Sequence, residues 1–161
     1  MDEAEKRKRR VCFTGHRPEK LIESEEYIKD RLRQEILRSI DEGYSVFISG
    51  MARGSDIWAA EIVLQMRSEG YEIKLICALP YNGFEERWSS DWQKRYRQIL
   101  SQADFVRCVS ERYAPNCFQK RNEWMVNHSA KVIAVYNGTK GGTQNTIEYA
   151  KRCKITVVVI L

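Results

Sequence analysis

Short apolar runs alternate along the chain with longer segments in which apolar residues recur every three or four positions. A continuous run of four to eight apolar residues is typical of a strand that is buried on both faces of a sheet. Spacings of three and four instead predict amphipathic helices, because these intervals place side chains on one helix face. We expect strands at residues 11–14, 44–49, 73–79, 104–109, 131–136 and 155–160. We expect helices at residues 24–42, 55–69, 84–102, 118–129 and 143–153.

The alternation of strands and helices predicts an α/β fold. Each strand–helix–strand unit makes two parallel strands, so the sheet is expected to be mostly parallel with helices on both faces. This is a three-layer, Rossmann-like architecture with a sheet of about six strands. No internal repeat or change of composition indicates a second domain. We therefore expect one domain over residues 11–161, preceded by a basic tail at residues 1–10.

The segment after the first predicted strand holds Gly15, His16 and Arg17. In open parallel sheets, ligands bind beyond the carboxyl ends of the strands, so polar residues placed there are candidates for a site. A glycine allows a sharp turn, and an arginine is a good bidentate partner for phosphate or carboxylate. The alternative is an ordinary surface turn with an exposed histidine and arginine.

The segment after the second predicted strand leads directly into a helix and holds Gly50, Arg53, Gly54 and Asp56. Small residues let a ligand approach the backbone, and unpaired amides at a helix start favour an anion. The segment has neither the GxGxxG spacing of dinucleotide-binding proteins nor the P-loop spacing of nucleotide hydrolases. Asp56 could also be a simple helix cap.

A better phosphate-binding loop follows the fifth predicted strand, where Gly141, Gly142, Thr143 and Thr146 lie at the start of the last helix. Backbone amides and the helix dipole favour negative charge at such a place. A glycine-containing turn with a threonine cap is the alternative reading of the same residues.

The helix expected at residues 118–129 carries Arg121 and Asn122 near its start, on the same edge of the predicted sheet. Asn122 could bind a base or a ribose, or could cap the helix, and the sequence does not choose between these roles.

Aromatic residues recur at helical spacing within residues 84–102, interleaved with basic ones. Such a stripe could stack bases, but it is more often the core-facing side of a helix. We expect Tyr96, Ile99 and Leu100 to lie in the core and leave both roles open for Trp88 and Trp92.

Charge changes this picture little. The chain carries 27 Lys and Arg residues against 22 Asp and Glu residues, which gives a net charge of +5. Five of the basic residues form a run at positions 6–10, which could touch a polyanion but is typical of a solvated tail. The remaining positive excess is small, so it permits nucleic-acid binding without favouring it.

Cysteine usage and hydropathy favour a cytoplasmic protein. The five cysteines are odd in number and no two form a CxxC pair, so we expect neither a zinc site nor a disulfide framework. No apolar run approaches the roughly 18 residues that a membrane-spanning helix needs. Residues 1–10 do not lead into an apolar segment long enough for a secretory signal. We expect no metal and no membrane partner.

Four stretches of the sequence together resemble a known family. In chain order they read CFTGHRPEKL, SGMARGSDIWAAE, QKRNEWMVNHS and GGTQNTIEYA, and each follows a predicted strand. They resemble the YpsA-like proteins of the SLOG superfamily, which also contains the Smf/DprA DNA-processing proteins and the LOG proteins. The resemblance covers about residues 10–161.

The resemblance implies a Rossmann-like sheet with a pocket for a nucleotide, a nucleotide-derived ligand of the ADP-ribose type, or nucleic acid. The residues that match the family's motifs, and would line this pocket, are Gly15, His16, Arg17, Gly50, Arg53, Gly54, Asp56, Arg121, Asn122, Gly141, Gly142, Thr143 and Thr146. Because SLOG relatives often self-associate, the resemblance also implies a homodimer.

The LOG enzymes resemble this chain less in the motif that carries out their reaction. They cleave the N-glycosidic bond of nucleoside monophosphates with a PGGxGTxxE motif, whose glutamate helps to stabilise the ribosyl transition state. Aligning residues 142–143 with the GT of that motif puts Thr146 in place of the glutamate. Aligning residues 141–142 with the GG recovers Glu148 but loses the second GT. Neither register keeps both the phosphate cradle and the acid, which disfavours this reaction.

Three functions follow from the sequence. The leading one is binding of a nucleotide-type ligand, in the manner of a sensor, with residues 141–143 holding phosphate and Arg17 and Arg53 balancing its charge. The second is hydrolysis of a nucleoside 5′-monophosphate, in which Glu148 or Glu123 stabilises an oxocarbenium-like state. The third is binding of single-stranded DNA.

Overall fold

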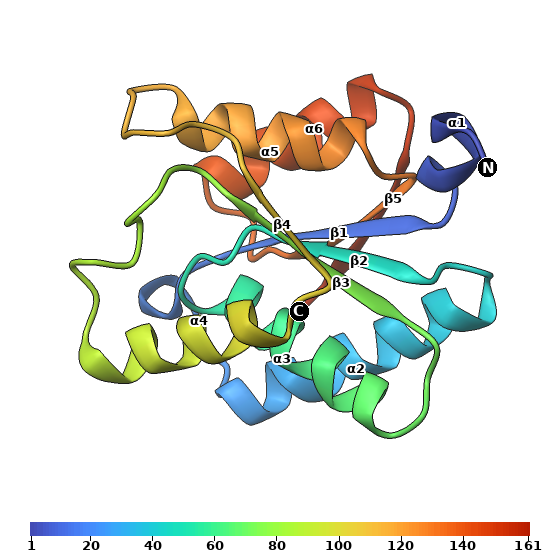
Figure 1. The fold of residues 1–161 in the computed structure, drawn as a ribbon, viewed down its shortest axis with the longest axis horizontal. Helices are drawn as coiled ribbons and strands as arrows, with labels where there is room; N and C mark the ends of the chain where they lie inside the picture. Colours follow the sequence, from blue (N-terminus) through green and yellow to red (C-terminus); the bar gives the residue numbers. More distant parts are fainter.

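A sheet of six parallel strands forms the middle layer of the computed structural model, which describes residues 1–161 (Figure 1). The strands are β1 (Arg10–Gly15), β2 (Val46–Ser49), β3 (Lys74–Leu79), β4 (Phe105–Cys108), β5 (Lys131–Val135) and β6 (Thr156–Ile160). Their order across the sheet is β4-β3-β2-β1-β5-β6, and every neighbouring pair is parallel. The predicted α/β fold with about six strands is confirmed.

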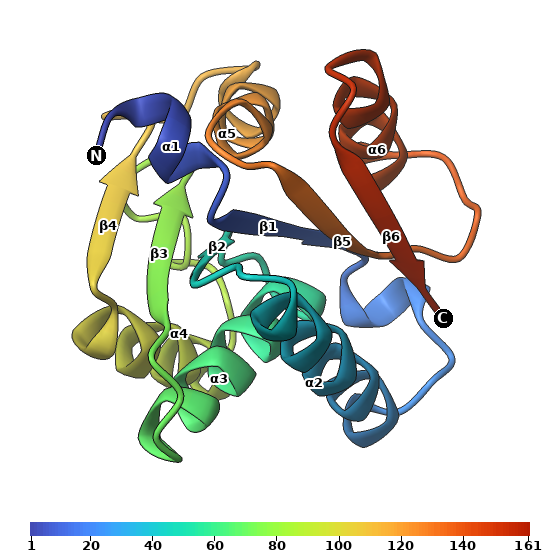
Figure 2. The same cartoon turned by 90° about the vertical axis from the view of Figure 1, so that its right-hand side faces the viewer.

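Helices cover both faces of the sheet. On one face lie α2 (Glu25–Asp41), α3 (Ser55–Ser68) and α4 (Ser90–Gln102), and on the other lie α5 (Cys117–Asn127) and α6 (Gly142–Arg152) (Figures 1 and 2). Two short pieces, α1 (Glu3–Arg7) and the 3-10 helix η1 (Pro18–Lys20), complete the list of elements. The predicted three-layer, Rossmann-like arrangement is therefore confirmed. No helix combines the length and the apolar character that crossing a bilayer would require.

The two faces of the sheet have separate cores, because successive strand residues point to opposite sides. The larger core, of 25 buried residues, lies between the sheet and α2, α3 and α4. A smaller one, of nine buried residues, lies beneath α5 and α6. Tyr96 and Ile99 are buried in the larger core, and Leu100, Trp88 and Trp92 pack against it while half-buried. The aromatic stripe is thus mainly a core-facing side.

The helix expected at residues 84–102 begins only at Ser90. The preceding residues form turns, in which Gly83 has a φ of +84°. The side chain of Ser89 accepts a hydrogen bond from the Trp92 amide at 3.5 Å and so caps the helix. Phe84 and Trp88 therefore lie on the connection between β3 and α4 rather than on the helix.

The basic tail expected at residues 1–10 is partly ordered against the domain. Asp2 caps the short helix α1 by accepting from the Glu5 amide at 2.9 Å. Arg7 donates to the Ser129 carbonyl at 2.9 Å, and Arg10, already part of β1, pairs with Glu3 at 2.6 Å. Part of the basic run therefore binds the protein's own surface, while Lys6, Lys8 and Arg9 are exposed.

The chain order reverses between β1 and β5. From β1 the chain moves outward through β2 and β3 to β4 at one edge, and it then returns to place β5 on the other side of β1. The helices α2, α3 and α4, which connect the strands from β1 to β4, lie on one face. The helices α5 and α6, which connect β4 to β5 and β5 to β6, lie on the other (Figure 2). A crevice therefore forms at the carboxyl ends of β1 and β5, which is where ligands bind in open parallel sheets.

Candidate functional site

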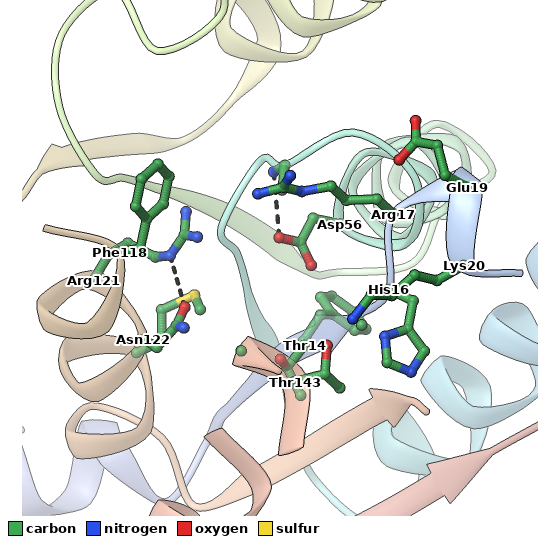
Figure 3. Close-up of a pocket in the computed structure, with 15 residues that line it drawn as sticks. Thr14, His16, Arg17, Glu19, Lys20, Asp56, Phe118, Arg121, Asn122 and Thr143 are labelled. Atoms are coloured by element: carbon green, nitrogen blue, oxygen red, sulfur yellow. Dashed lines mark hydrogen bonds between the residues drawn. The ribbon is translucent and has the colours of Figure 1, made fainter. Parts of the chain in front are cut away.

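A cavity of about 440 Å³ opens at this crevice (Figure 3). Its walls come from the end of β1 and the turn after it, the start of α3, one side of α5 and the first residues of α6. The volume falls in the range of small-molecule sites, about 300–1,000 Å³. Eight of the residues expected at the site line the cavity, namely Gly15, His16, Arg17, Asp56, Arg121, Asn122, Gly142 and Thr143.

The other five expected residues do not line this cavity: Gly50, Arg53, Gly54, Gly141 and Thr146. Thr146 is buried, and its hydroxyl donates to the Gly142 carbonyl at 2.8 Å, so it stabilises the first turn of α6. Gly54 has a φ of +88°, and a Cβ there would lie 2.9 Å from the His16 carbonyl oxygen. Such positions shape the backbone around the cavity without facing it.

Gly15 allows β1 and α3 to approach closely. The Ser55 hydroxyl donates to the His16 carbonyl at 2.9 Å, which fixes the start of α3 against the end of β1. A Cβ on Gly15 would lie 2.5 Å from the Ser55 Cβ and 2.9 Å from the Val135 Cβ. These contacts leave no room for a side chain, so this glycine is required for packing.

His16 is buried and joins the two sides of the crevice. Its Nε2 accepts a hydrogen bond from the Asn137 amide at 3.2 Å, which places the ring proton on Nδ1. Burial and the nearby Lys20 charge lower the pKa of His16 below its usual value, so the ring is neutral at physiological pH. The histidine therefore connects the turn after β1 to the loop after β5. Of His16 and Arg17, only Arg17 is exposed.

Arg121 is only 5% exposed and is held by backbone oxygens. Its Nη1 donates to the carbonyls of Gly50 and Ala78, the second at 3.5 Å. Its Nε donates to the Asn122 Oδ1 at 2.9 Å, which leaves the Asn122 amide nitrogen free (Figure 3). Burial lowers the pKa of Arg121, although the opposite charge of Asp56 favours the charged form.

Asp56 lines the cavity and has one carboxylate oxygen without a hydrogen-bond partner. The residue is 6% exposed, and its Oδ2 accepts from the Ala52 amide at 3.2 Å. Its Oδ1 is buried and has no hydrogen-bond partner. Burial raises the pKa of Asp56 to about 6, while the positive charges of Arg121 and Arg17 oppose that rise. Buried polar atoms are nearly always hydrogen-bonded in native proteins, so this atom is a candidate acceptor for a ligand.

The start of α6 presents free backbone amides. Its N-cap is Gly141, which supplies no side-chain cap. The first backbone bond runs from the Asn145 amide to the Gly141 carbonyl at 3.0 Å, so the amides of residues 142–144 have no partner in the helix. A Cβ on Gly142 would meet nothing within 4 Å, which means that open space adjoins the backbone here. This arrangement suits an anion.

Lys20 is a cavity residue that sequence reasoning missed. Its Nζ donates to the Lys140 carbonyl at 3.1 Å, and the Asn137 side chain donates to the Lys20 carbonyl at 2.8 Å. The lysine therefore places its charge beside the start of α6 (Figure 3). It lies in the GHRPEK stretch, but no sequence signal relates it to a loop 120 residues away. Glu19, Ala52, Phe118 and Met125 also line the cavity without having been expected.

The acids considered for a hydrolytic reaction are not in the cavity. Glu148 is exposed on α6, and Glu123 accepts from the Gln119 amide at 2.8 Å. The carboxylates that do line the cavity are Asp56 and Glu19, and Glu19 pairs with Arg53 at 2.6 Å. The placement of Glu148 and Glu123 thus removes the geometric basis of the glycosidase mechanism that the sequence suggested.

Sequence comparison relates the chain to bacterial proteins of similar length. The prophage-derived protein YoqJ of Bacillus subtilis is 35% identical over 138 residues, which cover 78% of this chain and 81% of YoqJ. A UPF0398 protein of Bacillus cereus is 34% identical over 152 residues, which cover 88% of this chain and 82% of that protein.

Two solved structures of DNA processing protein A share the fold. The protein from Streptococcus pneumoniae has a TM-score of 0.68 and 19% identity, and the match covers 96% of this chain but only 50% of that one. The protein from Helicobacter pylori has a TM-score of 0.68 and 20% identity, and the match covers 98% of this chain and 66% of that one. This chain therefore corresponds to one part of those longer proteins.

A family model, YpsA, described as the YspA SLOG family, matches residues 11–156, which is nearly the whole chain. Together with the similarity to the Bacillus proteins, this match identifies the chain as a member of the YpsA family of SLOG proteins.

Proposed function

We propose that this protein binds a nucleotide or a nucleotide-derived anion in the cavity between β1 and β5. One observation carries the proposal: the start of α6, with its free amides, and Asp56, whose buried Oδ1 has no partner, line the same cavity. The first group is suited to a phosphate and the second to a hydroxyl donor. A nucleotide carries both groups within one molecule.

The phosphate is assigned to the start of α6. The amides of residues 142–144 and the Thr143 hydroxyl would donate to its oxygens, and the helix dipole adds attraction. Lys20 and Arg17 bring positive charge to the same cavity, and Arg17 forms no ion pair within the protein. These groups balance the charge that a phosphate would bring.

The sugar and base are assigned to the opposite wall. Asp56 Oδ1 would accept a hydrogen bond from a ribose hydroxyl, and the free amide nitrogen of Asn122 could donate to a base. Phe118 and Met125 add apolar surface beside these polar groups. In this proposal the bound ligand is itself the signal, as in a sensor domain.

Replacing Gly142 by aspartate is expected to remove binding. Aspartate would fill the open space beside the α6 amides and repel a phosphate there. A nucleotide at a hundred times its Kd should raise the Tm of the native protein by about 5–10 °C and that of Gly142→Asp by less than about 1 °C. A thermal-shift panel of nucleoside mono- and diphosphates, dinucleotides and ADP-ribose measures this.

Gln98→Glu is the control for that experiment, because it adds the same charge at an exposed position of α4 outside the cavity. It should keep the full ligand-dependent shift. Retention of the shift by Gly142→Asp would contradict the phosphate assignment. The absence of any shift across the panel would contradict the proposed function as a whole.

Binding of single-stranded nucleic acid is the second candidate. It is favoured by the fold that this chain shares with DNA processing protein A of Helicobacter pylori, a protein that binds single-stranded DNA. Arg17, Arg53 and Arg87 line the same edge of the sheet. If this function holds, the affinity for a fluorescent deoxythymidine oligonucleotide should fall at least tenfold between 50 and 200 mM salt, given roughly three or more phosphate contacts. Absent or salt-independent binding in fluorescence anisotropy would exclude it.

A further inference from the structure

A second cavity of about 220 Å³, here called the annex, adjoins the first. Both are lined by Arg17, Ala52, Phe118 and Arg121, so a ligand in one can extend into the other. The remaining lining residues of the annex are Arg53, Tyr81, Phe84, Arg87 and Trp88. All of these except Arg53 lie on the connection between β3 and α4, and Phe84, Arg87 and Trp88 fall within the segment 84–102 for which the sequence predicts a helix.

The lining of the annex is basic and contains no carboxylate. Arg53 forms an ion pair at 2.6 Å with Glu19, which lines the first cavity. Arg17 and Arg87 are exposed and form no ion pair or hydrogen bond within the protein. Two unpaired guanidinium groups therefore line one chamber, which favours an anionic occupant.

Aromatic rings form the rest of the annex. Phe84 is buried, and its ring lies edge-on to Trp88 at 4.9 Å and to Tyr81 at 5.9 Å. Tyr81, Trp88 and Phe118 are half-buried, so part of each ring remains accessible. Partly exposed rings beside free arginines suit a planar ring that carries a phosphate, because the ring can stack and the phosphate can pair.

We propose that the annex receives the second ring of a ligand in which two nucleoside units are joined by a pyrophosphate bridge. The inference rests on the proposed function, because the first unit occupies the main cavity. Arg17 lines both chambers and therefore lies where the bridge would pass. Arg87 pairs with the bridge, and Trp88 stacks on the second ring. These two residues then select two-unit ligands over mononucleotides.

Isothermal titration calorimetry of the full chain with AMP, GMP and their pyrophosphate-linked dimers tests this assignment. The dimers should bind at least tenfold more tightly than the monophosphates, since stacking of one base is worth about tenfold or more. Arg87→Ala and Trp88→Leu should each reduce this advantage to about threefold or less. Their affinities for the monophosphates should change by less than about twofold.

Two features of the design keep the result interpretable. Leucine replaces Trp88 because the indole packs against Phe84 and Tyr96, and Arg87→Ala alters only an exposed residue. Arg97→Ala is the matched control, because it removes the same charge from an exposed position of α4 outside both cavities. The control should keep the full advantage of the dimers.

Four outcomes would contradict the annex assignment or the proposed function. Equal affinity for monophosphates and dimers, or an equal loss of both in Arg87→Ala, would show that the annex is not a second-ring site. Tighter binding of a phosphodiester-linked dinucleotide than of the pyrophosphate dimer would show that the annex binds a nucleic-acid strand instead. Failure of every ligand to bind would instead contradict the proposed function itself.

Discussion

Asp56→Asn is expected to raise the free energy of unfolding by about 2–3 kcal/mol at pH 8 while it weakens nucleotide binding. Burial raises the pKa of this carboxyl from 3.8 to about 6, so its charged form is disfavoured in the folded protein. One unit of pKa shift corresponds to about 1.4 kcal/mol. Asparagine keeps the shape of the side chain without the charge, so the variant avoids most of the free-energy cost of burying an ionised carboxylate.

The increase in the free energy of unfolding caused by Asp56→Asn should depend on pH. A carboxyl whose pKa is raised on folding contributes stability below its unfolded pKa of about 4, and this contribution disappears as the pH rises through about 6. Native protein and Asp56→Asn should therefore differ little at pH 4 and most at pH 8. Urea unfolding at both pH values measures the difference, with the exposed Asp91→Asn on α4 as the control. Equal stability of Asp56→Asn and native protein at pH 8 would contradict the argument.

The same substitution should weaken the ligand at least tenfold. A hydrogen bond from a hydroxyl to an ionised carboxylate is worth about 1.5–3 kcal/mol, and asparagine cannot supply that charge. Binding to the native protein should also weaken as the pH falls below 6, where Asp56 becomes protonated in the free protein. Calorimetric titrations at pH 5 and pH 8 test both statements. A variant that is more stable and yet binds less well would mark Asp56 as a functional residue.

Arg121→Met is expected to destabilise the protein by about 3–5 kcal/mol, because it leaves two buried carbonyls without their donor, at about 1–3 kcal/mol each. The guanidinium group satisfies backbone carbonyls of Gly50 and Ala78, and methionine cannot donate to them. Its loss also removes the main positive charge that favours ionised Asp56, so the pKa of Asp56 should rise further. The Tm should fall by about 10 °C or more.

A double mutant separates these two effects. If Arg121 acts partly through Asp56, Asp56→Asn in the Arg121→Met background should recover about 1–2 kcal/mol more at pH 8 than it gains in the native background. Urea unfolding of the four proteins completes the cycle. Arg97→Met, at an exposed position, should leave stability unchanged within about 0.5 kcal/mol. A loss below about 1 kcal/mol in Arg121→Met would contradict the structural role.

Much of the fold could be predicted from the sequence, because a parallel sheet buried on both faces requires continuous apolar runs. The apolar run at residues 131–136, for example, predicts a strand, and β5 (Lys131–Val135) is wholly buried. The alternating helices then made a parallel sheet the simplest solution. Since ligand sites in such sheets lie at strand ends, most of the expected residues, such as Gly15 and Thr143, came together in one cavity.

What the sequence did not predict depends on contacts between distant segments and on turn geometry. Lys20 joins the site only because the turn after β1 meets the loop after β5. The role of Asp56 depends on an oxygen that lacks a partner, which no spacing can reveal. Helical periodicity extends through Phe84 and Trp88, but the backbone forms turns over residues 82–87 and is extended at Ser89, so the helix begins only at Ser90 and both rings line the annex.

The hydrogen bond between the Asn137 amide and the His16 ring joins the turn after β1, which lines the cavity, to the loop after β5 in the unliganded protein. A second bond, from the Asn137 side chain to the Lys20 carbonyl, holds the same loop. A ligand that enters there does not have to order these segments, so little conformational entropy is lost on association. More of the attraction between the protein and its ligand therefore remains as affinity, and even a small metabolite could be held at low concentration.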